Sequence, residues 1–229
     1  NWKDVVGLAN ADVDLSAKPW QLPDWQVDSL NENSNPTEYA KVILGMRAAK
    51  QDPTNVNGRN LVNELAAKQE VTGNFGEYIT DTIWSMVALD TAGKTYDVSG
   101  AVDYLLNKQT SDGGFAFSGD IADPDMTGFT LIALASHMNV ESVNDVVYQA
   151  EECLKSIQLD SGGFGYGGGD AENSASSAAV IRGLVACNKD ITSSEWTKNG
   201  NSMIDALFEF QLPNKSFSHL GSETSDLST

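Results

Sequence analysis

A short pattern that recurs along the chain constrains the fold more than any single residue does. The stretch Tyr104–Phe115 reads YLLNKQTSDGGF, and Cys153–Phe164 reads CLKSIQLDSGGF. In both, a Gln is followed four residues later by Gly and six residues later by Phe. A third copy lies at Gln69–Phe75, and a weaker one, with Ser216 in place of a Gly, lies at Gln211–Phe217. The pattern predicts a tight turn after each Gln.

The spacing of these turns indicates a repeat protein. Successive Gln residues lie 40 (109 − 69), 49 (158 − 109) and 53 (211 − 158) positions apart. Recurrence at such a period is typical of stacked supersecondary units, each too small to bury its apolar face alone.

Helical periodicity fills the segments between the turns. The segments that precede each Gln are amphipathic, whereas those that follow each turn are apolar most of the way round, as expected of helices buried on all sides. We therefore expect an outer set of amphipathic helices around an inner set of apolar ones, with no strands. The predicted helices are 2–10, 24–30, a helix from Pro36 to before Asp52, 59–68, 79–91, 98–108, 125–138, 143–158, 174–187 and 198–210.

Composition excludes several classes of partner. The chain has 229 residues, 41% of them hydrophobic, and a formal net charge of −18. Such an acidic surface repels nucleic acids and anionic lipids, and no apolar run is long enough to span a membrane. The chain begins with Asn and shows no basic-then-apolar leader, so we expect an excised piece of a longer protein. The acidic composition suits an exported or cell-surface domain.

The repeated sequence pattern resembles that of a known family. It resembles the QW repeat of terpenoid cyclases and protein prenyltransferases, and the prenyltransferase/squalene-oxidase-type repeat regions of Gram-positive cell-surface proteins. The resemblance covers nearly the whole chain. It implies an all-α fold, an α/α toroid with five complete helical hairpin repeats plus an incomplete sixth, in a single domain over 1–229.

The resemblance also implies how each turn is held. The Gln would hydrogen-bond backbone groups at the next turn, the Gly would supply a positive φ, and the aromatic residue would pack beneath the next inner helix. This chain departs from the family by having Phe where Trp is usual. Phe keeps the packing but loses the indole donor.

One acidic stretch suggests chemistry. Asp123-Pro124-Asp125-Met126-Thr127 looks like the D-x-D-D-T motif of class II terpene cyclases. The resemblance would make Asp125 the acid that protonates an alkene, a role that requires a neutral carboxyl group. Met126 stands where the third acid belongs, so the carboxylate that tunes this acid is missing. Helix capping by Asp123 and Asp125 is the alternative.

Other candidates concern metals and thiols. Asp120, Asp123 and Asp125 offer oxygen ligands for Ca²⁺ but lack EF-hand spacing. His137 and His219 are the only histidines and match no zinc motif. We therefore predict no metal and no cofactor. The sequence leaves open whether Cys153 and Cys187 are free thiols or form a disulfide.

The functional hypothesis is a non-catalytic binding or interaction module, with a small molecule or a partner protein in the central cavity or at the acidic rim. The alternative is a terpene-cyclase-like enzyme that uses Asp125. We also expect self-association through the incomplete last repeat. The predicted ligand-binding residues include acids at inner-helix starts, which capping alone also explains, and aromatic residues nearby: Glu38, Tyr39, Asp81, Trp84, Asp123, Asp125, Phe129, Tyr166 and Glu172.

Overall fold

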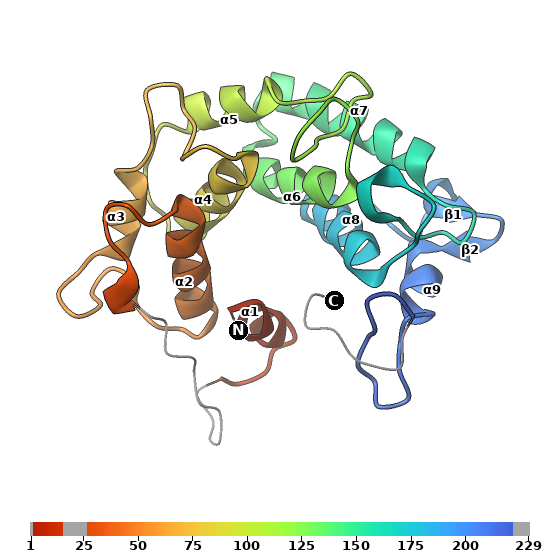
Figure 1. Cartoon of the computed structure of the whole chain (residues 1–229), viewed down its shortest axis with the longest axis horizontal. Helices are drawn as coiled ribbons and strands as arrows, with labels where there is room; N and C mark the ends of the chain where they lie inside the picture. The colour runs from red at the N-terminus through yellow and green to blue at the C-terminus, as the bar shows by residue number, and fades with distance from the viewer. Residues whose placement is uncertain (1, 16–26, 222–229) are drawn as a thin grey trace. The chain divides into compact units, whose positions relative to one another are not determined.

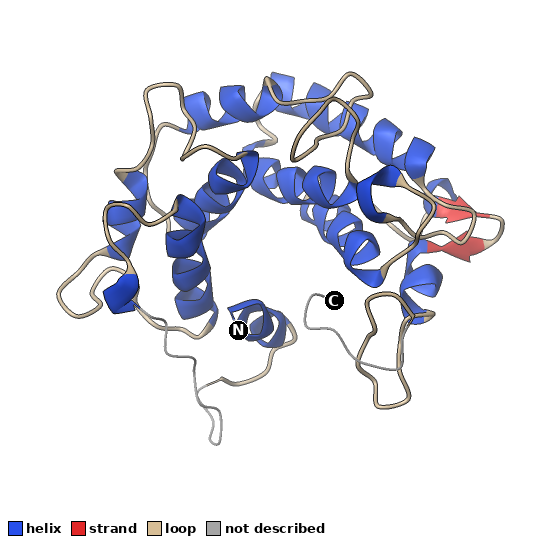
Figure 2. Cartoon of the chain, in the orientation of Figure 1, coloured by secondary structure: helices blue, strands red, loops and turns tan. Residues whose placement is uncertain are grey.

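The structure of the protein is a computed structural model that describes residues 2–15 and 27–221. Helices dominate these residues, and one short hairpin supplies the strands (Figures 1 and 2). The all-α fold class is confirmed, but the expectation of no strands is wrong at this hairpin. The α-helices are α1 (Trp2–Asn10), α2 (Pro36–Ala48), α3 (Leu61–Ala66), α4 (Ile79–Thr91), α5 (Val98–Leu106), α6 (Pro124–Leu134), α7 (Glu141–Ile157), α8 (Ser174–Ala186) and α9 (Met203–Phe208). The 3₁₀ helices are η1 (Val27–Ser29), η2 (Ala135–His137), η3 (Tyr166–Gly168) and η4 (Ser194–Trp196).

Most helix predictions are confirmed, and one is wrong at its start. The predicted helix 198–210 begins only at Met203, because β1 (Thr197–Lys198) and β2 (Asn201–Ser202) pair antiparallel before it. Asn199 and Gly200 connect the strands with φ angles of 49° and 87°. Two positive φ angles at Asn-Gly form the tight hairpin turn that competes with a helix. The predicted helix 24–30 lies partly outside the described residues, and η1 covers Val27–Ser29 of the part that is described.

Contacts divide the chain into two compact units, Asn1–Tyr104 and Leu105–Thr229. In the first, called the N-terminal unit, α2 packs against α4 and against α1 (Figure 1). In the second, called the C-terminal unit, α6 packs against α8 and α7. The single domain and the count of five complete repeats stay predictions.

The Gln of each turn bonds as the resemblance implied. Its Nε2 donates to the carbonyl of the residue four positions later, and in three turns also to a carbonyl further along the chain. The first acceptors are Gly73 at 2.9 Å, Gly113 at 2.7 Å, Gly162 at 2.7 Å and, more weakly, Lys215 at 3.4 Å. The second are Asp97 at 2.7 Å, Val146 at 3.4 Å and Trp196 at 3.0 Å.

The glycine four residues after Gln158 is required for two reasons. Gly162 has a φ of 91°, in the left-handed region that Gly adopts without steric cost. A Cβ there would also lie 2.7 Å from the carbonyl oxygens of Asn201 and Ser202. The turn therefore touches the backbone that precedes α9, and no larger residue fits without displacing it. In the weaker copy, Lys215 takes the equivalent position with a φ of 73°.

A hydroxyl on each following helix completes the turn. The backbone amide of Phe75 donates to Thr82 Oγ1 at 2.9 Å, and that of Phe115 donates to Thr127 Oγ1 at 2.9 Å. Phe164 donates likewise to Ser177 Oγ at 3.0 Å. Each of these hydroxyls lies at the fourth residue of its helix, and each Phe is fully buried. We call α4, α6 and α8, which carry these hydroxyls, the inner helices.

The sequence predicted inner helices that are buried on all sides, and this prediction is wrong for α6 and α8. On α6 the partly exposed positions are Asp125, Phe129 and Ile132, and on α8 the exposed ones include Arg182 and Val185. Val185 is 52% exposed. The spacing of these residues defines one open stripe on each helix. The other faces of the two helices contribute to the core of the C-terminal unit.

Candidate functional site

The open stripes of α6 and α8 lie beside a close crossing of the two helices. A Cβ on Gly128 would collide with the Ala179 carbonyl, and one on Gly183 would lie 2.9 Å from the Gly128 Cα. The backbones can approach this closely because both positions lack a side chain. Phe129 follows Gly128 and Arg182 precedes Gly183, so the two side chains flank the crossing.

We call this surface the α6–α8 face. It is mainly apolar and carries one cation. It is formed by Phe129, Ile132, Ala178, Arg182 and Val185, and the partly exposed Asp125 lies on the same stripe of α6, one turn before Phe129. Partial burial against the protein lowers the pKa of the Arg182 guanidinium, although its side chain still reaches solvent. No acidic residue among those the structure describes pairs with Arg182. The face can therefore hold an apolar body and a negative or strongly polar group beside it.

Both carboxylate oxygens of Asp123 accept hydrogen bonds from backbone amides. Its Oδ1 accepts from the Met126 amide at 2.9 Å, which makes it the N-cap of α6. Its Oδ2 accepts from the Gly167 amide at 3.1 Å, which holds the η3 turn against the start of α6. The capping interpretation of Asp123 is therefore confirmed. Asp125 is the second residue of the helix, and its Oδ1 is buried.

Two further candidates lie in the glycine-rich segment before α8. Tyr166 opens η3 and is exposed. Glu172 lies immediately before the N-cap Asn173, and its carboxylate lies so close to Gly163 that a Cβ there would require the carboxylate to move. Gly165 and Glu172 pair as an isolated bridge. The C-terminal unit therefore brings Asp123, Asp125 and Phe129 together on α6 and ties the Tyr166 turn to them.

The candidates of the N-terminal unit serve structural roles. Glu38 accepts from the Asn35 amide at 3.1 Å and Asp81 from the Tyr78 amide at 3.1 Å, so each bonds the backbone amide of its own helix N-cap. Asp81 also accepts from the Thr37 hydroxyl, which joins α2 to α4. The rings of Trp84 and Trp2 pack edge to face, with centroids 5.6 Å apart.

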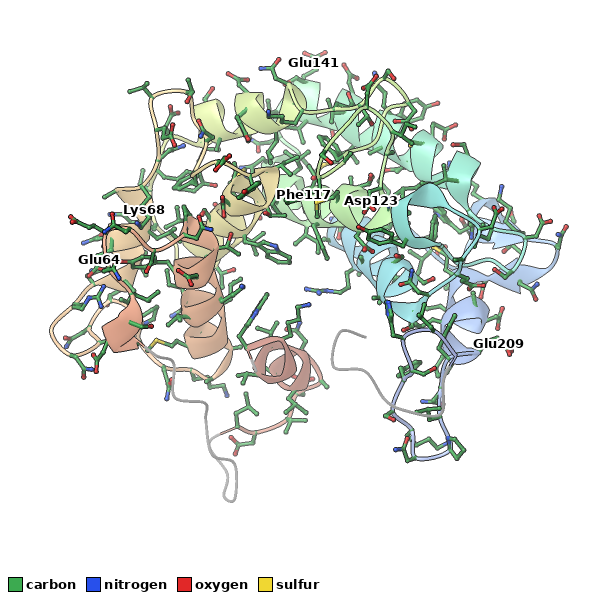
Figure 3. All side chains as sticks on the ribbon, in the orientation of Figure 1. Glu64, Lys68, Phe117, Asp123, Glu141 and Glu209 are labelled. Carbon is green, nitrogen blue, oxygen red and sulfur yellow. The ribbon has the colours of Figure 1, made fainter. Side chains whose placement is uncertain are left out.

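Tyr39 was assigned to a ligand site from the sequence, but the structure places it in the core. Its hydroxyl lies 3.1 Å from Glu64 Oε2 and accepts from Arg59 at 3.3 Å. Arg59 in turn pairs with Glu64 through two nitrogens and reaches the Val27 carbonyl (Figure 3 labels Glu64). Burial and the neighbouring Glu64 raise the pKa of Tyr39. This network holds α3 and the preceding loop on α2.

Sequence reasoning missed Arg182 and the fourth-position hydroxyls. Arg182 is the one charged residue in the otherwise small and apolar α8, and that contrast was the available signal. The hydroxyls share a position only after the helix starts are known, so their equivalence was hidden by loops of unequal length.

One cavity lies away from every candidate. It measures about 170 Å³ and is lined by residues from the ends of α1 and α2 and from the segment after α1. The lining residues are Ala9, Asp12, Val13, Asp14, Leu15, Ala48, Ala49 and Lys50. None of the predicted ligand-binding residues contributes to it.

The thiols do not form a disulfide. Cys153 and Cys187 are free and buried, which excludes the disulfide alternative. Burial is the main cause that raises the pKa of each to about 11. Within residues 2–15 and 27–221, no group of three or more His, Cys, Asp or Glu side chains is arranged to hold a metal. No helix in that part of the chain is both long and apolar enough to cross a bilayer.

Comparison with known proteins identifies the fold family. The family model of the prenyltransferase alpha-alpha toroid domain matches residues 30–151 and 126–228. No curated protein matches the sequence. The two matched ranges together cover most of the chain, and they include all four Gln–Phe turns. The chain therefore belongs to the prenyltransferase alpha-alpha toroid domain family.

Proposed function

We propose that this chain is a non-catalytic module that binds a small apolar molecule on the α6–α8 face. The observation that carries the proposal is the open apolar stripe around Arg182. Folded proteins bury most of their Val, Ile and Phe side chains. An apolar face that stays open beside a cation therefore favours the binding of a ligand there. The ligand's apolar body would contact Phe129 and Val185, and a polar group would lie beside Arg182.

The geometry around Asp125 supports binding over catalysis. Met126 is buried where the tuning carboxylate of a cyclase would be, and both oxygens of Asp123 already accept from backbone amides. A carboxyl group without a neighbouring carboxylate loses one of the two effects that keep it protonated. The cyclase alternative rests on the buried Oδ1 of Asp125, since burial is the other effect.

The test is a binding titration with a panel of apolar probes: a sterol, a long-chain isoprenoid alcohol and a fatty acid. The variant Val185→Ser places a hydroxyl on the α6–α8 face and should weaken the best probe at least about tenfold, close to 1.4 kcal/mol. Tyr148→Ser, on the exposed surface of α7, is the matched control and should leave the affinity unchanged. Equal affinities for both variants would contradict the proposal.

The cyclase alternative has its own assay. The protein is incubated with squalene or a linear isoprenoid diphosphate, and products are analysed by gas chromatography and mass spectrometry. We expect no cyclic product. A cyclic product that disappears in Asp125→Asn would replace the binding proposal with an enzymatic one.

We further propose that the module acts outside the cell or on its surface, which its acidic composition supports. Self-association at the last repeat belongs to the same proposal. Phe208 and Leu220 are exposed there, and the Phe208 ring lies 6.0 Å from that of Phe217. A protein that remains monomeric in light scattering across a wide concentration range would exclude self-association.

A further inference from the structure

Two of the turns carry extra residues that the fold does not need. In the N-terminal unit, α4 begins at Ile79, soon after Phe75. In the C-terminal unit, α6 begins at Pro124 after a longer segment from Phe115, and α8 at Ser174 after a longer segment still from Phe164. The Gln, Phe and hydroxyl bonds are the same in all three turns, so the added residues are free to serve another purpose.

These two insertions, residues 116–123 and 165–173, meet and form one surface, which we call the insertion surface. The Gly167 amide donates to Asp123 Oδ2 at 3.1 Å, and a Cβ on Gly168 would contact the Ala122 carbonyl at 3.4 Å. Figure 3 shows Phe117 and Asp123 on the first insertion. A third contact fixes the shape of the first insertion, because the Ser111 amide donates to Asp120 Oδ1 at 2.8 Å.

Large apolar side chains stand out from this surface. Ile121 is 75% exposed and Tyr166 is 76% exposed, and Phe117 is also exposed. Each comes from an insertion. Exposed apolar groups that cluster on loops and are rimmed by polar residues mark interaction sites on soluble proteins.

The same surface is acidic and contains no base. Residues 116–123 and 165–173 hold four acids (Asp120, Asp123, Asp170 and Glu172) and no Lys, Arg or His, and Asp112 lies beside them, bonded to the Ala122 amide. Asp112 and Asp120 accept hydrogen bonds from backbone amides and hydroxyls rather than from bases. Bonds from Ser111 lower the pKa of Asp120. Burial alone would raise the pKa of Asp112, but bonds from Thr110 and Ala122 outweigh it and lower the pKa. Both carboxylates therefore stay negative at neutral pH.

We propose that the insertion surface docks a basic amphipathic polypeptide segment, with Lys and Arg beside the carboxylates and apolar side chains on Ile121 and Tyr166. The net charge of −18 opposes a nucleic acid and an anionic membrane, and the insertion surface, which has acids and no base, opposes a second copy of itself. A cationic segment is attracted by the same field, and its apolar side covers the exposed side chains. The inference goes beyond the proposed function, because it uses the insertions and leaves the α6–α8 face free.

The experiment measures binding of a fluorescent Lys/Leu peptide that forms an amphipathic helix. A second peptide has the same composition in an order without an apolar side. The ordered peptide should bind at least about tenfold more tightly than the scrambled one, and its affinity should fall as salt is raised. Equal affinity for both peptides, or no binding of the ordered peptide at low salt, would overturn the proposal.

Matched double variants locate the site. Ile121→Ser with Tyr166→Ser should weaken the ordered peptide at least about tenfold. Val71→Ser with Tyr148→Ser removes one aliphatic and one aromatic exposed side chain elsewhere and should change the affinity less than about twofold. Equal losses in the two double variants would overturn the proposal. Circular dichroism and thermal unfolding verify that each variant is folded.

Two further measurements separate the alternatives. Sedimentation of the chain alone tests a second copy as the occupant: a dimer that Ile121→Ser with Tyr166→Ser dissociates would overturn the peptide proposal. Val185→Ser should leave peptide binding unchanged. A failure of the small-molecule proposal and a failure of the peptide proposal are thereby distinguished.

Discussion

The backbone amide of Phe115 donates to Thr127 Oγ1 at 2.9 Å, and the same hydroxyl lies 3.3 Å from the Phe115 carbonyl. Both residues are fully buried. The hydroxyl is thus placed to accept from the amide and to donate to the carbonyl of one residue, far from water. Because an unpaired buried amide is costly, this contact fixes where α6 sits on the turn that precedes it.

Thr127→Val should destabilise the protein markedly. Valine keeps the shape of the side chain but leaves the Phe115 amide without its acceptor. The free energy of unfolding should fall by about 1–3 kcal/mol, measured by urea denaturation.

Thr130→Val on the same helix is the matched control. Thr130 is equally buried, but its hydroxyl donates to the Met126 carbonyl at 2.8 Å, four residues earlier in the helix. That carbonyl is positioned to accept from the helix backbone as well, so the loss should be less than about 1 kcal/mol. Equal losses for Thr127→Val and Thr130→Val would show that the turn contact has no special weight.

Gln158→Leu should cost more than Gln211→Leu. Gln158 is buried and donates to two carbonyls, those of Gly162 at 2.7 Å and Trp196 at 3.0 Å. Gln211 donates at 3.4 Å to Lys215 in a solvent-exposed setting. We expect a loss of about 2 kcal/mol for Gln158→Leu and within about 0.5 kcal/mol for Gln211→Leu. If thermal denaturation gives the same loss of stability for both variants, the repeated Gln does not stabilise the protein through its hydrogen bonds.

Gly162→Ala and Gly167→Ala separate backbone strain from collision. Both glycines have a positive φ, 91° and 61°, so each substitution carries the cost of a left-handed residue. A Cβ on Gly162 would lie 2.7 Å from the Asn201 and Ser202 carbonyls, whereas nothing lies within 4 Å of one on Gly167. Gly162→Ala should therefore lose at least about 1 kcal/mol more than Gly167→Ala. The opposite order in chemical denaturation would exclude a close approach at Gly162.

The sequence allowed the repeat, the family and most helices to be predicted, because Gln, Gly and Phe recur at fixed spacing and each serves a backbone need. The helix at Ile79–Thr91 was predicted to the residue. The hairpin before Met203 was missed because the two-residue Asn199-Gly200 turn interrupts a segment whose composition suits a helix.

The candidate site was less predictable than the fold. Acids at helix starts look alike in sequence, whether they cap a helix or face a ligand; Asp123 and Asp81 proved to bond backbone amides. Tyr39 has the periodicity of a helix face, but its hydroxyl forms hydrogen bonds with Glu64 and Arg59, which lie further along the chain. Such tertiary partners leave no trace in local spacing.

The two thiols should make the protein less stable at alkaline pH. Burial, followed by nearby carboxylates, raises the pKa of Cys153 and of Cys187 from 9.0 to about 11. Between these values the unfolded chain has released the thiol protons and the folded chain still holds them. The contribution of the two buried thiols to the free energy of unfolding is therefore fully present below pH 9 and decreases as the pH rises toward 11. Urea denaturation from about pH 8 to 10 measures this decrease.

The double variant Cys153→Ala with Cys187→Ala is the control for that decrease. It removes both titrating groups, so its unfolding free energy should change less between about pH 8 and 10, whatever its stability at neutral pH. Tyr96, whose pKa burial and Asp90 also raise, is retained in both proteins and adds the same decrease to each. A native protein whose thiols react with a disulfide reagent at neutral pH as fast as the unfolded chain would contradict the burial on which this prediction depends.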